Sequence, residues 1–263
     1  MTADALPLPQ PALGPLPSGQ PPHRRSLALV SNEEVAPAIH VLTFDLPPTD
    51  PLYFLPGQYV TFYLQREGRS VTRSYSIFSS AERHERVSLL VKEVPHGFAS
   101  TYLCGLSPAA RPSLMALAPL GRFVLQDPGG RIVVLVATGV GLAPFVPMLE
   151  LLRRDRPETP VWLFLGNRYA AEMVYHTELR ALSAAWPTFH FVPVISRPPA
   201  DGSWKGAVGH VEEAVSGRFP DLSMADVYIC GSNPMVSQMQ ALSLQLKGRR
   251  DRIFVDRWGE SEE

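Results

Sequence analysis

The residue pattern of this 263-residue chain changes near residue 130, and this change constrains the fold more than any other feature. Before it, short runs that alternate apolar and polar residues are separated by turn formers. After it, Ile132–Ala137 is an unbroken apolar run, as expected for a parallel strand buried on both faces. The turn-rich segment Asp127-Pro128-Gly129-Gly130 lies at the change. The sequence therefore predicts two domains, residues 26–127 and residues 128–263.

The first domain is expected to be an antiparallel barrel or sandwich, because several short strand candidates follow one another with turns between them. The clearest candidates are residues 41–46, 59–64 and 87–91, and turn formers such as Pro56-Gly57 separate them. Residues 1–25 precede this domain and are rich in proline, which removes backbone donors and fixes φ. We expect this segment to be an extended or disordered tail.

The second domain shows alternating strand and helix patterns, which predict a doubly wound sheet of parallel strands with helices on its faces. The expected strands are residues 132–137, 161–165, 189–195, 226–230 and 253–255. The expected helices are residues 144–154, 170–184, 208–215 and 234–246.

Composition excludes several classes of protein. The formal net charge is -1, so there is no global basic field to attract nucleic acid. No apolar run approaches the ~20 residues needed to span a bilayer, and no secretory signal is visible at the N-terminus. Two cysteines cannot hold a four-thiolate iron–sulfur cluster, and the seven histidines show no metal-ligand spacing. Cys104 and Cys230 could form one disulfide, but a reduced, cytoplasmic protein is the simpler interpretation.

The segment Thr138-Gly139-Val140-Gly141-Leu142-Ala143-Pro144 follows the buried strand and opens a helix, which is the context required of a dinucleotide loop. Its glycines let backbone amides approach a pyrophosphate, and Pro144 is tolerated in the first helical turn. Pro144 also replaces the third glycine of the usual fingerprint. The second strand ends in Gly166-Asn167-Arg168, without the acidic residue that commonly holds a ribose. The loop is therefore not of the common dehydrogenase type.

The tetrapeptide Arg73-Ser74-Tyr75-Ser76 supplies three groups that a flavin needs. Arginine suits bidentate contact with a pyrophosphate, tyrosine offers an aromatic plane with a polar tip, and Ser76 offers a donor near N5. Arg73 and Tyr75 are two residues apart, so they lie on the same face of a strand. The alternative is an ordinary strand with a surface arginine and a core tyrosine.

The segment Gly97-Phe98-Ala99-Ser100 lies about twenty residues downstream of the tetrapeptide. Gly97 allows a tight turn, and Ser100 or Thr101 can cap a helix whose free amides would bind the flavin pyrophosphate. Val91, Phe98 and Ala99 are assigned to the same cofactor site. The alternative for Ser100 is a plain helix cap without a ligand.

The fourth strand of the second domain ends in Cys230-Gly231-Ser232-Asn233-Pro234-Met235. Ligands of open α/β sheets lie at the carboxyl ends of strands, so we expect Cys230 to contact a nicotinamide. The alternative is a small buried thiol. We assign Cys230 no role as a nucleophile, because no histidine is clearly paired with it.

Together these motifs resemble the ferredoxin–NADP reductase family, in the broad sense that includes oxygenase reductases and flavohaemoglobin reductase modules. The matching segments follow the family order and are Pro56-Gly57-Gln58, Arg73-Ser74-Tyr75-Ser76, Gly97 to Ser100, Pro119-Leu120-Gly121, Thr138 to Pro144 and Cys230 to Met235. The resemblance covers roughly residues 30–258. It implies an antiparallel six-stranded β-barrel that binds FAD, followed by a Rossmann-like parallel α/β domain that binds NAD(P).

The resemblance also implies a role for each matched residue. Tyr75 would stack on the isoalloxazine, Ser76 would hydrogen-bond near N5, and Trp258 near the C-terminus would shield the flavin unless it simply packs in the core. The residues expected to bind cofactors are Arg73, Ser74, Tyr75, Ser76, Val91, Gly97, Phe98, Ala99, Ser100, Thr138, Gly139, Val140, Gly141, Arg168, Ser196, Arg197, Cys230 and Trp258. The residues expected to take part in catalysis are Ser76, Cys230 and Trp258.

The function that follows from the resemblance is a stand-alone FAD-containing NAD(P)H reductase. Its electrons would go to a separate carrier, such as a ferredoxin or an oxygenase component, because the chain lacks cysteines for an iron–sulfur domain of its own. Ser196-Arg197 could hold the 2′-phosphate of NADPH, whereas Trp204-Lys205-Gly206 resembles NADH-using oxygenase reductases. The sequence favours NADH slightly. The rival is a non-catalytic or siderophore-type flavin-binding module, or an electron-transfer subunit of a larger complex.

Overall fold

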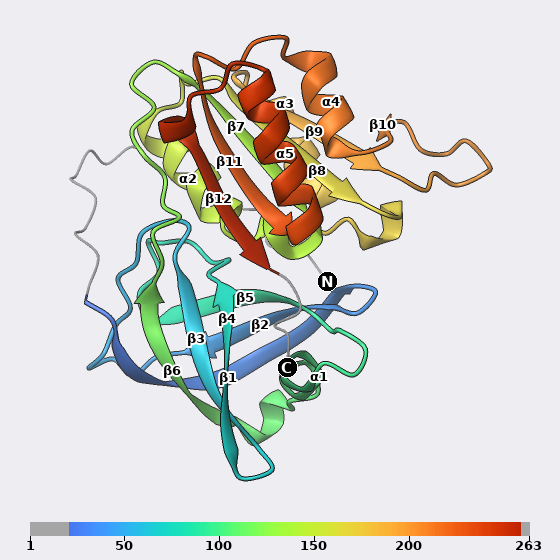
Figure 1. Ribbon diagram of the computed structural model, residues 1–263. Helices are drawn as coiled ribbons and strands as arrows, with labels where there is room; N and C mark the ends of the chain where they lie inside the picture. The colour runs from blue at the N-terminus through green and yellow to red at the C-terminus, as the bar shows by residue number, and fades with distance from the viewer. Residues whose placement is uncertain (1–20, 259–263) are drawn as a thin grey trace. The chain divides into compact units, whose positions relative to one another are not determined.

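The computed structural model describes residues 21–258, and of Trp258 it describes the backbone (Figure 1). The proline-rich residues 1–20 lie outside the described part. The chain forms two compact units. Residues 21–125 and Ala143–Glu150 belong to one unit, and Gln126–Leu142 and the residues from Leu151 onward belong to the other. Between residues 21 and 258, every helix is too short or too polar to cross a bilayer.

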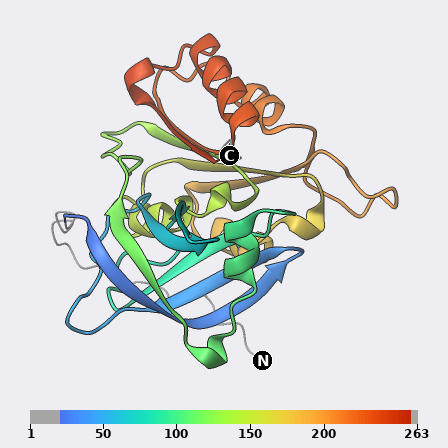
Figure 2. The same cartoon turned by 60° about the horizontal axis from the view of Figure 1, so that its bottom comes forward.

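The first unit is built on a six-stranded antiparallel sheet. Its strands are β1 (His23–Ala36), β2 (Ile39–Asp45), β3 (Tyr59–Arg66), β4 (Arg69–Ser76), β5 (Arg86–Lys92) and β6 (Ser113–Leu120). Their order is β4-β3-β6-β1-β2-β5, and each neighbouring pair is antiparallel. An isolated antiparallel bridge joins Ile77, the residue after β4, to Leu89 of β5. The strands therefore curve around a common interior as a barrel rather than a sandwich (Figures 1 and 2).

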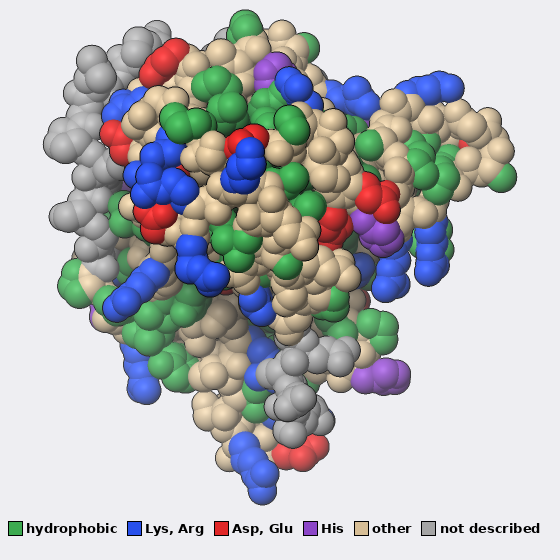
Figure 3. Space-filling model, turned by 45° about the horizontal axis from the view of Figure 1, so that its top comes forward, with side chains coloured by type: hydrophobic (Ala, Val, Ile, Leu, Met, Phe, Trp, Pro, Cys, Tyr) green, Lys and Arg blue, Asp and Glu red, His purple; other side chains and the backbone are tan. Residues whose placement is uncertain are grey.

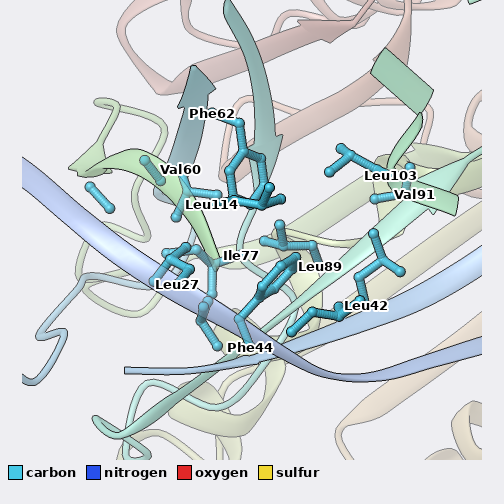
Figure 4. Close-up of a cluster of buried hydrophobic side chains, with 14 of the residues drawn as sticks. Leu27, Leu42, Phe44, Val60, Phe62, Ile77, Leu89, Val91, Leu103 and Leu114 are labelled. Carbon is cyan, nitrogen blue, oxygen red and sulfur yellow. The ribbon is translucent and has the colours of Figure 1, made fainter. Parts of the chain in front are cut away.

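Alternation along these strands fills the barrel. On β2 the buried Leu42 and Phe44 alternate with the less buried Val41 and Thr43. Phe44 meets the buried Phe62 of β3 with 5.4 Å between ring centroids (Figure 4). Helix α1 (Phe98–Cys104) contributes Ala99, Leu103 and Cys104 to the same core. Because the interior is apolar, its burial drives the folding of this unit.

Strand β1 begins three residues earlier than the sequence predicts. The predicted domain starts at Ser26, yet His23–Arg25 already pair with β6, and Arg25 is buried. The Arg25 guanidinium donates to a carboxylate oxygen of Asp50 at 2.6 Å and to the Ala118 carbonyl at 3.2 Å. A charged side chain can be buried when it is paired in this way, which the sequence pattern does not reveal.

The second unit is a six-stranded parallel sheet with the order β10-β9-β8-β7-β11-β12. Its strands are β7 (Ile132–Thr138), β8 (Val161–Asn167), β9 (Phe189–Ile195), β10 (Ala207–Val208), β11 (Ala225–Ser232) and β12 (Ile253–Trp258). Its helices are α3 (His176–Ala185), α4 (Val211–Arg218) and α5 (Asn233–Gln245). Helix α2 (Phe145–Asp155) begins among residues grouped with the barrel unit and ends among residues of this unit. Short 3-10 turns occur at Gly139–Leu142, Ala170–Glu172 and Arg250–Arg252, and Pro108–Ala110 forms one in the barrel unit. The predicted doubly wound α/β architecture is confirmed.

Two predicted helices begin later than expected. Residues 170–184 divide into a 3-10 turn and α3, because Tyr175 adopts a left-handed conformation with φ 59° that interrupts the helix. Residues 208–215 were expected to be helical, but Val208 pairs in β10 and Gly209 has φ 121°. A capping box between His210 and Glu213 then starts α4 at Val211.

The strand order of the parallel sheet reverses beside β7. The chain moves from β7 to β8 on one side, and later returns to place β11 on the other side. The carboxyl ends of β7 and β11 flank this topological switch point, where open α/β sheets bind their ligands. At this point the backbone of Gly141 lies very close to the end of β11. A Cβ atom added to Gly141 would lie 2.3 Å from the Cys230 carbonyl oxygen.

We predict that Gly141→Ala destabilises the parallel-sheet unit by about 2 kcal/mol, because the atoms that the methyl group would meet are backbone atoms of Cys230 and Gly231. Urea unfolding followed by circular dichroism measures the loss. Gly217→Ala is the matched control, because Gly217 lies in α4 and a Cβ atom there meets nothing within 4 Å. The control should be neutral or slightly stabilising. Equal stability of the Gly141 variant and the native chain would show that the loop does not need this close approach.

Candidate functional site

Strand β4 presents Arg73 and Tyr75 on one face, as the sequence predicts. Arg73 is opposite the buried Phe62 and Tyr75 is opposite the buried Val60, so both side chains lie on the barrel's inner face. Both are only partly buried, because the pairing of β4 with β5 is confined to the bridge at Ile77 in the described structure. Arg73 donates to the Thr72 carbonyl at 2.8 Å and carries further N–H donors on its guanidinium.

The Tyr75 ring forms part of the wall beside Arg73. It packs against the barrel core, with its centroid 6.2 Å from that of Phe62. Burial raises the pKa of the phenol well above its usual range, and the nearby Cys104 thiol raises it further. Tyr75 is therefore a protonated phenol at physiological pH. It offers an aromatic plane and a hydrogen-bond donor.

Ser74 and Ser76 lie on the other face of β4. Ser76 pairs with Tyr59, and the Ser74 and Thr61 hydroxyls are 2.8 Å apart. The register therefore does not place the Ser76 side chain on the same face as Tyr75. Whether Ser76 reaches flavin N5 remains a prediction.

The start of helix α1 differs from the one that the sequence predicts. We expected Ser100 or Thr101 to cap it, but the capping residue is Gly97 and the prediction was wrong. The Ser100 hydroxyl instead accepts from the Val94 amide at 3.0 Å and donates to the Gly97 carbonyl at 3.2 Å. It therefore holds the turn that leads into the helix. The first amides of a helix have no partner within it, so the backbone of residues 98–100 retains the donors that a phosphate needs.

Of the other residues predicted to contact the flavin, two have buried side chains. Val91 and Ala99 are buried in the barrel core, and contact between either residue and a flavin remains a prediction. Phe98 is only partly buried, and its ring stacks on that of Tyr102, with 6.1 Å between centroids. We did not single out Tyr102 from the sequence. The spacing of these two aromatic residues by one helical turn was the available signal.

In the parallel-sheet unit, Thr138 ends β7 at the switch point. Its hydroxyl oxygen is buried and has no hydrogen-bond partner among the described residues. A Cβ atom on Gly231 would lie 2.3 Å from this oxygen, so the hydroxyl rests directly against the backbone that follows β11. A buried polar atom without a partner is unusual. A nicotinamide carboxamide supplies the donor and the acceptor that would satisfy it.

The predicted dinucleotide loop is open at its tip and tight at its base. Gly139 has φ 53°, and a Cβ atom there would meet nothing within 4 Å. Gly141 is pressed against β11, and Val140 lies between them in a 3-10 turn. Gly139 therefore has open space beside its Cα atom, and contact of its backbone with a pyrophosphate remains a prediction. These features fit a pyridine nucleotide at this edge of the sheet.

Cys230 lies beside this loop as a buried, free thiol. Burial raises its pKa well above the usual range, and the neighbouring Asp256 carboxylate adds to the shift. The thiol is therefore neutral, which agrees with the absence of a nucleophilic role in our interpretation. Cys104 is also free and buried. Contact between Cys230 and a nicotinamide remains a prediction.

Arg168, Ser196 and Arg197 come together at the carboxyl ends of β8 and β9. The Ser196 amide donates to the Asn167 carbonyl at 3.1 Å, and the Arg197 amide donates to the Arg168 carbonyl at 2.9 Å. The exposed Arg197 guanidinium also donates to the Tyr169 hydroxyl at 2.9 Å and lies 5.6 Å from the centre of its ring. Sequence reasoning missed Tyr169. No motif marks it.

Two further predictions concern Trp258 and metals. The backbone of Trp258 pairs with Ser232 at the end of β12, and its side chain lies outside the described part. Residues 21–258 contain no group of three or more histidine, cysteine or acidic side chains arranged to hold a metal ion.

Two family models match this chain. Residues 26–124 match the oxidoreductase FAD-binding domain, and residues 135–241 match the oxidoreductase NAD-binding domain. The chain is 32% identical over 238 residues to ferredoxin–NADP reductase B of Sorangium cellulosum, which covers 88% of this chain and 96% of that protein. It is 33% identical over 210 residues to the toluate 1,2-dioxygenase electron transfer component of Pseudomonas putida. That match covers 80% of this chain and 60% of the relative's length.

The fold is also shared with solved structures. The cytochrome P450 reductase GcoB of Amycolatopsis superposes with a TM-score of 0.82 and 26% sequence identity, over 90% of this chain and 70% of that one. The two matched domains follow each other in the order that the motifs predicted. The chain therefore belongs to the ferredoxin–NADP reductase family in its broad sense, and it is an FAD-dependent NAD(P)H oxidoreductase.

Proposed function

We propose that this chain is the reductase component of an electron-transfer system, which takes a hydride from NAD(P)H and delivers single electrons to a separate acceptor protein. The observation that carries the proposal is the unsatisfied Thr138 hydroxyl beside the open Gly139 loop, on a chain whose other unit presents Arg73 and Tyr75. One unit thus has groups suited to a nicotinamide, and the other has groups suited to a flavin.

Each group has a definite task in this proposal. When bound, the nicotinamide and the flavin supply the hydride and single-electron chemistry, and the protein supplies binding and orientation. The Arg73 guanidinium neutralises negative charge on the flavin pyrophosphate. The Tyr75 ring restricts the position of the isoalloxazine ring. The Thr138 hydroxyl orients the nicotinamide carboxamide. The protonated Tyr75 phenol and the neutral Cys230 thiol add no negative charge near the redox groups.

The acceptor is proposed to be a ferredoxin or an oxygenase component. The support is that relatives of this chain are named as a ferredoxin–NADP reductase and as the electron transfer component of a dioxygenase. The face drawn in Figure 3 carries both cationic and anionic side chains. Residue ranges 26–127 and 128–263 remain our proposal for the domain boundaries, and a cytoplasmic location remains a prediction.

The direct test is the reduction of ferricyanide, a one-electron acceptor, by purified protein reconstituted with FAD. We expect NADH or NADPH to drive continuous turnover, and we expect FAD-free protein to show none. Turnover with neither nucleotide, despite bound FAD, would overturn the proposal and favour the non-catalytic flavin-binding module.

The choice between NADH and NADPH is expected to depend on Arg197. If its guanidinium binds the 2′-phosphate, Arg197→Ala should raise the KM for NADPH about tenfold and leave the KM for NADH unchanged, as for loss of one charge-assisted hydrogen bond. Steady-state ferricyanide kinetics with both nucleotides measure this. Tyr169→Phe is the matched control, because it removes the hydroxyl that holds Arg197 and keeps the charge. Equal effects of Arg197→Ala on both nucleotides would exclude Arg197 as the phosphate-binding residue.

Trp258 is proposed to shield the flavin and to be displaced when the nicotinamide binds. The motivation is its place at the end of β12, beside the end of β11 at the switch-point edge. We expect Trp258→Ala to change the preference between NADH and NADPH or the affinity for the nucleotide, because the nicotinamide then has no shielding ring to displace. Unchanged KM and kcat with both nucleotides would remove this role.

A further inference from the structure

The barrel unit has an open hollow of about 560 Å³ that the proposed chemistry does not use. The end of β2 with the residues after it lines one side, and the start of β5 with the residues before it lines another. The Leu46 amide donates to the Glu85 carbonyl at 2.8 Å and so joins these two segments. Arg111, which lies shortly before β6, completes the lining. We call this feature the arginine hollow.

The arginine hollow has an excess of positive charge. Three of its lining residues are arginines, Arg83, Arg86 and Arg111, whereas two are acidic, Asp45 and Glu85. The chain as a whole has a formal net charge of -1, so the excess is local to this hollow. A concave surface with one predominant sign of charge raises the local concentration of small molecules of the opposite sign. The hollow therefore favours an anion.

Asp45 holds two of the guanidinium groups in place. The Arg86 Nε donates to Asp45 Oδ1 at 2.7 Å, and the Arg111 Nη2 donates to Asp45 Oδ2 at 3.4 Å. Each guanidinium has five N–H donors, so most of them are left for a ligand. The Arg86 and Arg111 side chains are 52% and 67% exposed, which leaves these donors accessible. Guanidinium groups that are already oriented lose less entropy when an anion binds.

The backbone of Arg111 is strained. Its φ of 43° and ψ of 52° are left-handed, a conformation that glycine adopts freely and that costs energy for other residues. Pro112 follows, and the residue before a proline is normally extended. The local backbone therefore does not explain an arginine at this position, whereas a role of its guanidinium at the hollow does.

We propose that the arginine hollow binds a phosphate monoester of a small metabolite. The dianionic phosphate has three terminal oxygens, which can accept from Arg86 and Arg111 together. Arg83 adds a third cation, and in the described part of the chain it forms no ion pair within 4 Å, although its charge acts on Glu150 of α2. The exposed Pro48 supplies an apolar wall for the organic part of the ligand. The volume lies in the range of small-molecule sites.

Calorimetric titration of the full-length, FAD-loaded protein with phenyl phosphate and with inorganic phosphate tests this inference. Bound FAD keeps the probes from the proposed flavin site. We expect one molecule of probe to bind per chain, and phenyl phosphate to bind more tightly than inorganic phosphate. Arg86→Gln and Arg111→Gln should each weaken binding of both probes about tenfold, as for loss of a charge-assisted hydrogen bond. Arg111→Gly should show the same loss with the fold intact, because glycine adopts the left-handed conformation without strain.

Arg24→Gln is the matched control and should leave both affinities unchanged. Arg24 is an exposed arginine of the same unit, but its guanidinium lies 4.9 Å from the centre of the Tyr63 ring and does not line the hollow. Absence of binding to the native protein, or native affinity in the Arg86 and Arg111 variants, would overturn the proposal. Displacement of the probes by NAD⁺ or NADP⁺ would also overturn it, since the phosphate would then lie at the dinucleotide loop. Succinate that binds as tightly as phenyl phosphate would contradict the assignment to a phosphate.

Discussion

The parallel-sheet unit depends on one constraint, which is the close approach of the Gly139–Leu142 turn to the end of β11. Because Gly141 has no side chain, the chain leaves β7 and enters α2 in contact with the Cys230 carbonyl. The ends of β7 and β11 are already adjacent there, since Ala137 pairs with Cys230. The Thr138 hydroxyl lies against Gly231, where it has no partner in the described structure. The ligand-binding character of this edge thus follows from one tight backbone crossing.

The barrel unit depends on a different constraint, which is that its barrel is incompletely closed. The bridge between Ile77 and Leu89 closes the strands at one place, and the partly buried Arg73 and Tyr75 lie farther back along β4. Helix α1 completes the core with Ala99 and Leu103, while its outer side carries Tyr102. The barrel thereby keeps a continuous apolar interior and still leaves polar and aromatic groups for a cofactor.

The sequence predicted the elements whose patterns are simple. The apolar run at β7 and the segment at Phe189–Ile195 were placed within a residue of their observed bounds, because strands buried in a parallel sheet have few polar positions. The sequence did not predict features that depend on the backbone angles of single residues or on partners distant in the chain. The left-handed Tyr175 interrupts a helical pattern, and burial of Arg25 depends on Asp50. Serine is a residue type that often caps helices, but the Ser100 hydroxyl forms its hydrogen bonds within the turn that precedes α1.

Anaerobic titration of the FAD-loaded protein with NADH and with NADPH tests the central claim most directly, since it measures reduction of the flavin by the nucleotide without any acceptor. The account predicts that at least one nucleotide bleaches the yellow absorption of the bound flavin stoichiometrically, and that air restores it. A protein that stays yellow with both nucleotides, or one that remains colourless after incubation with FAD, would contradict the account.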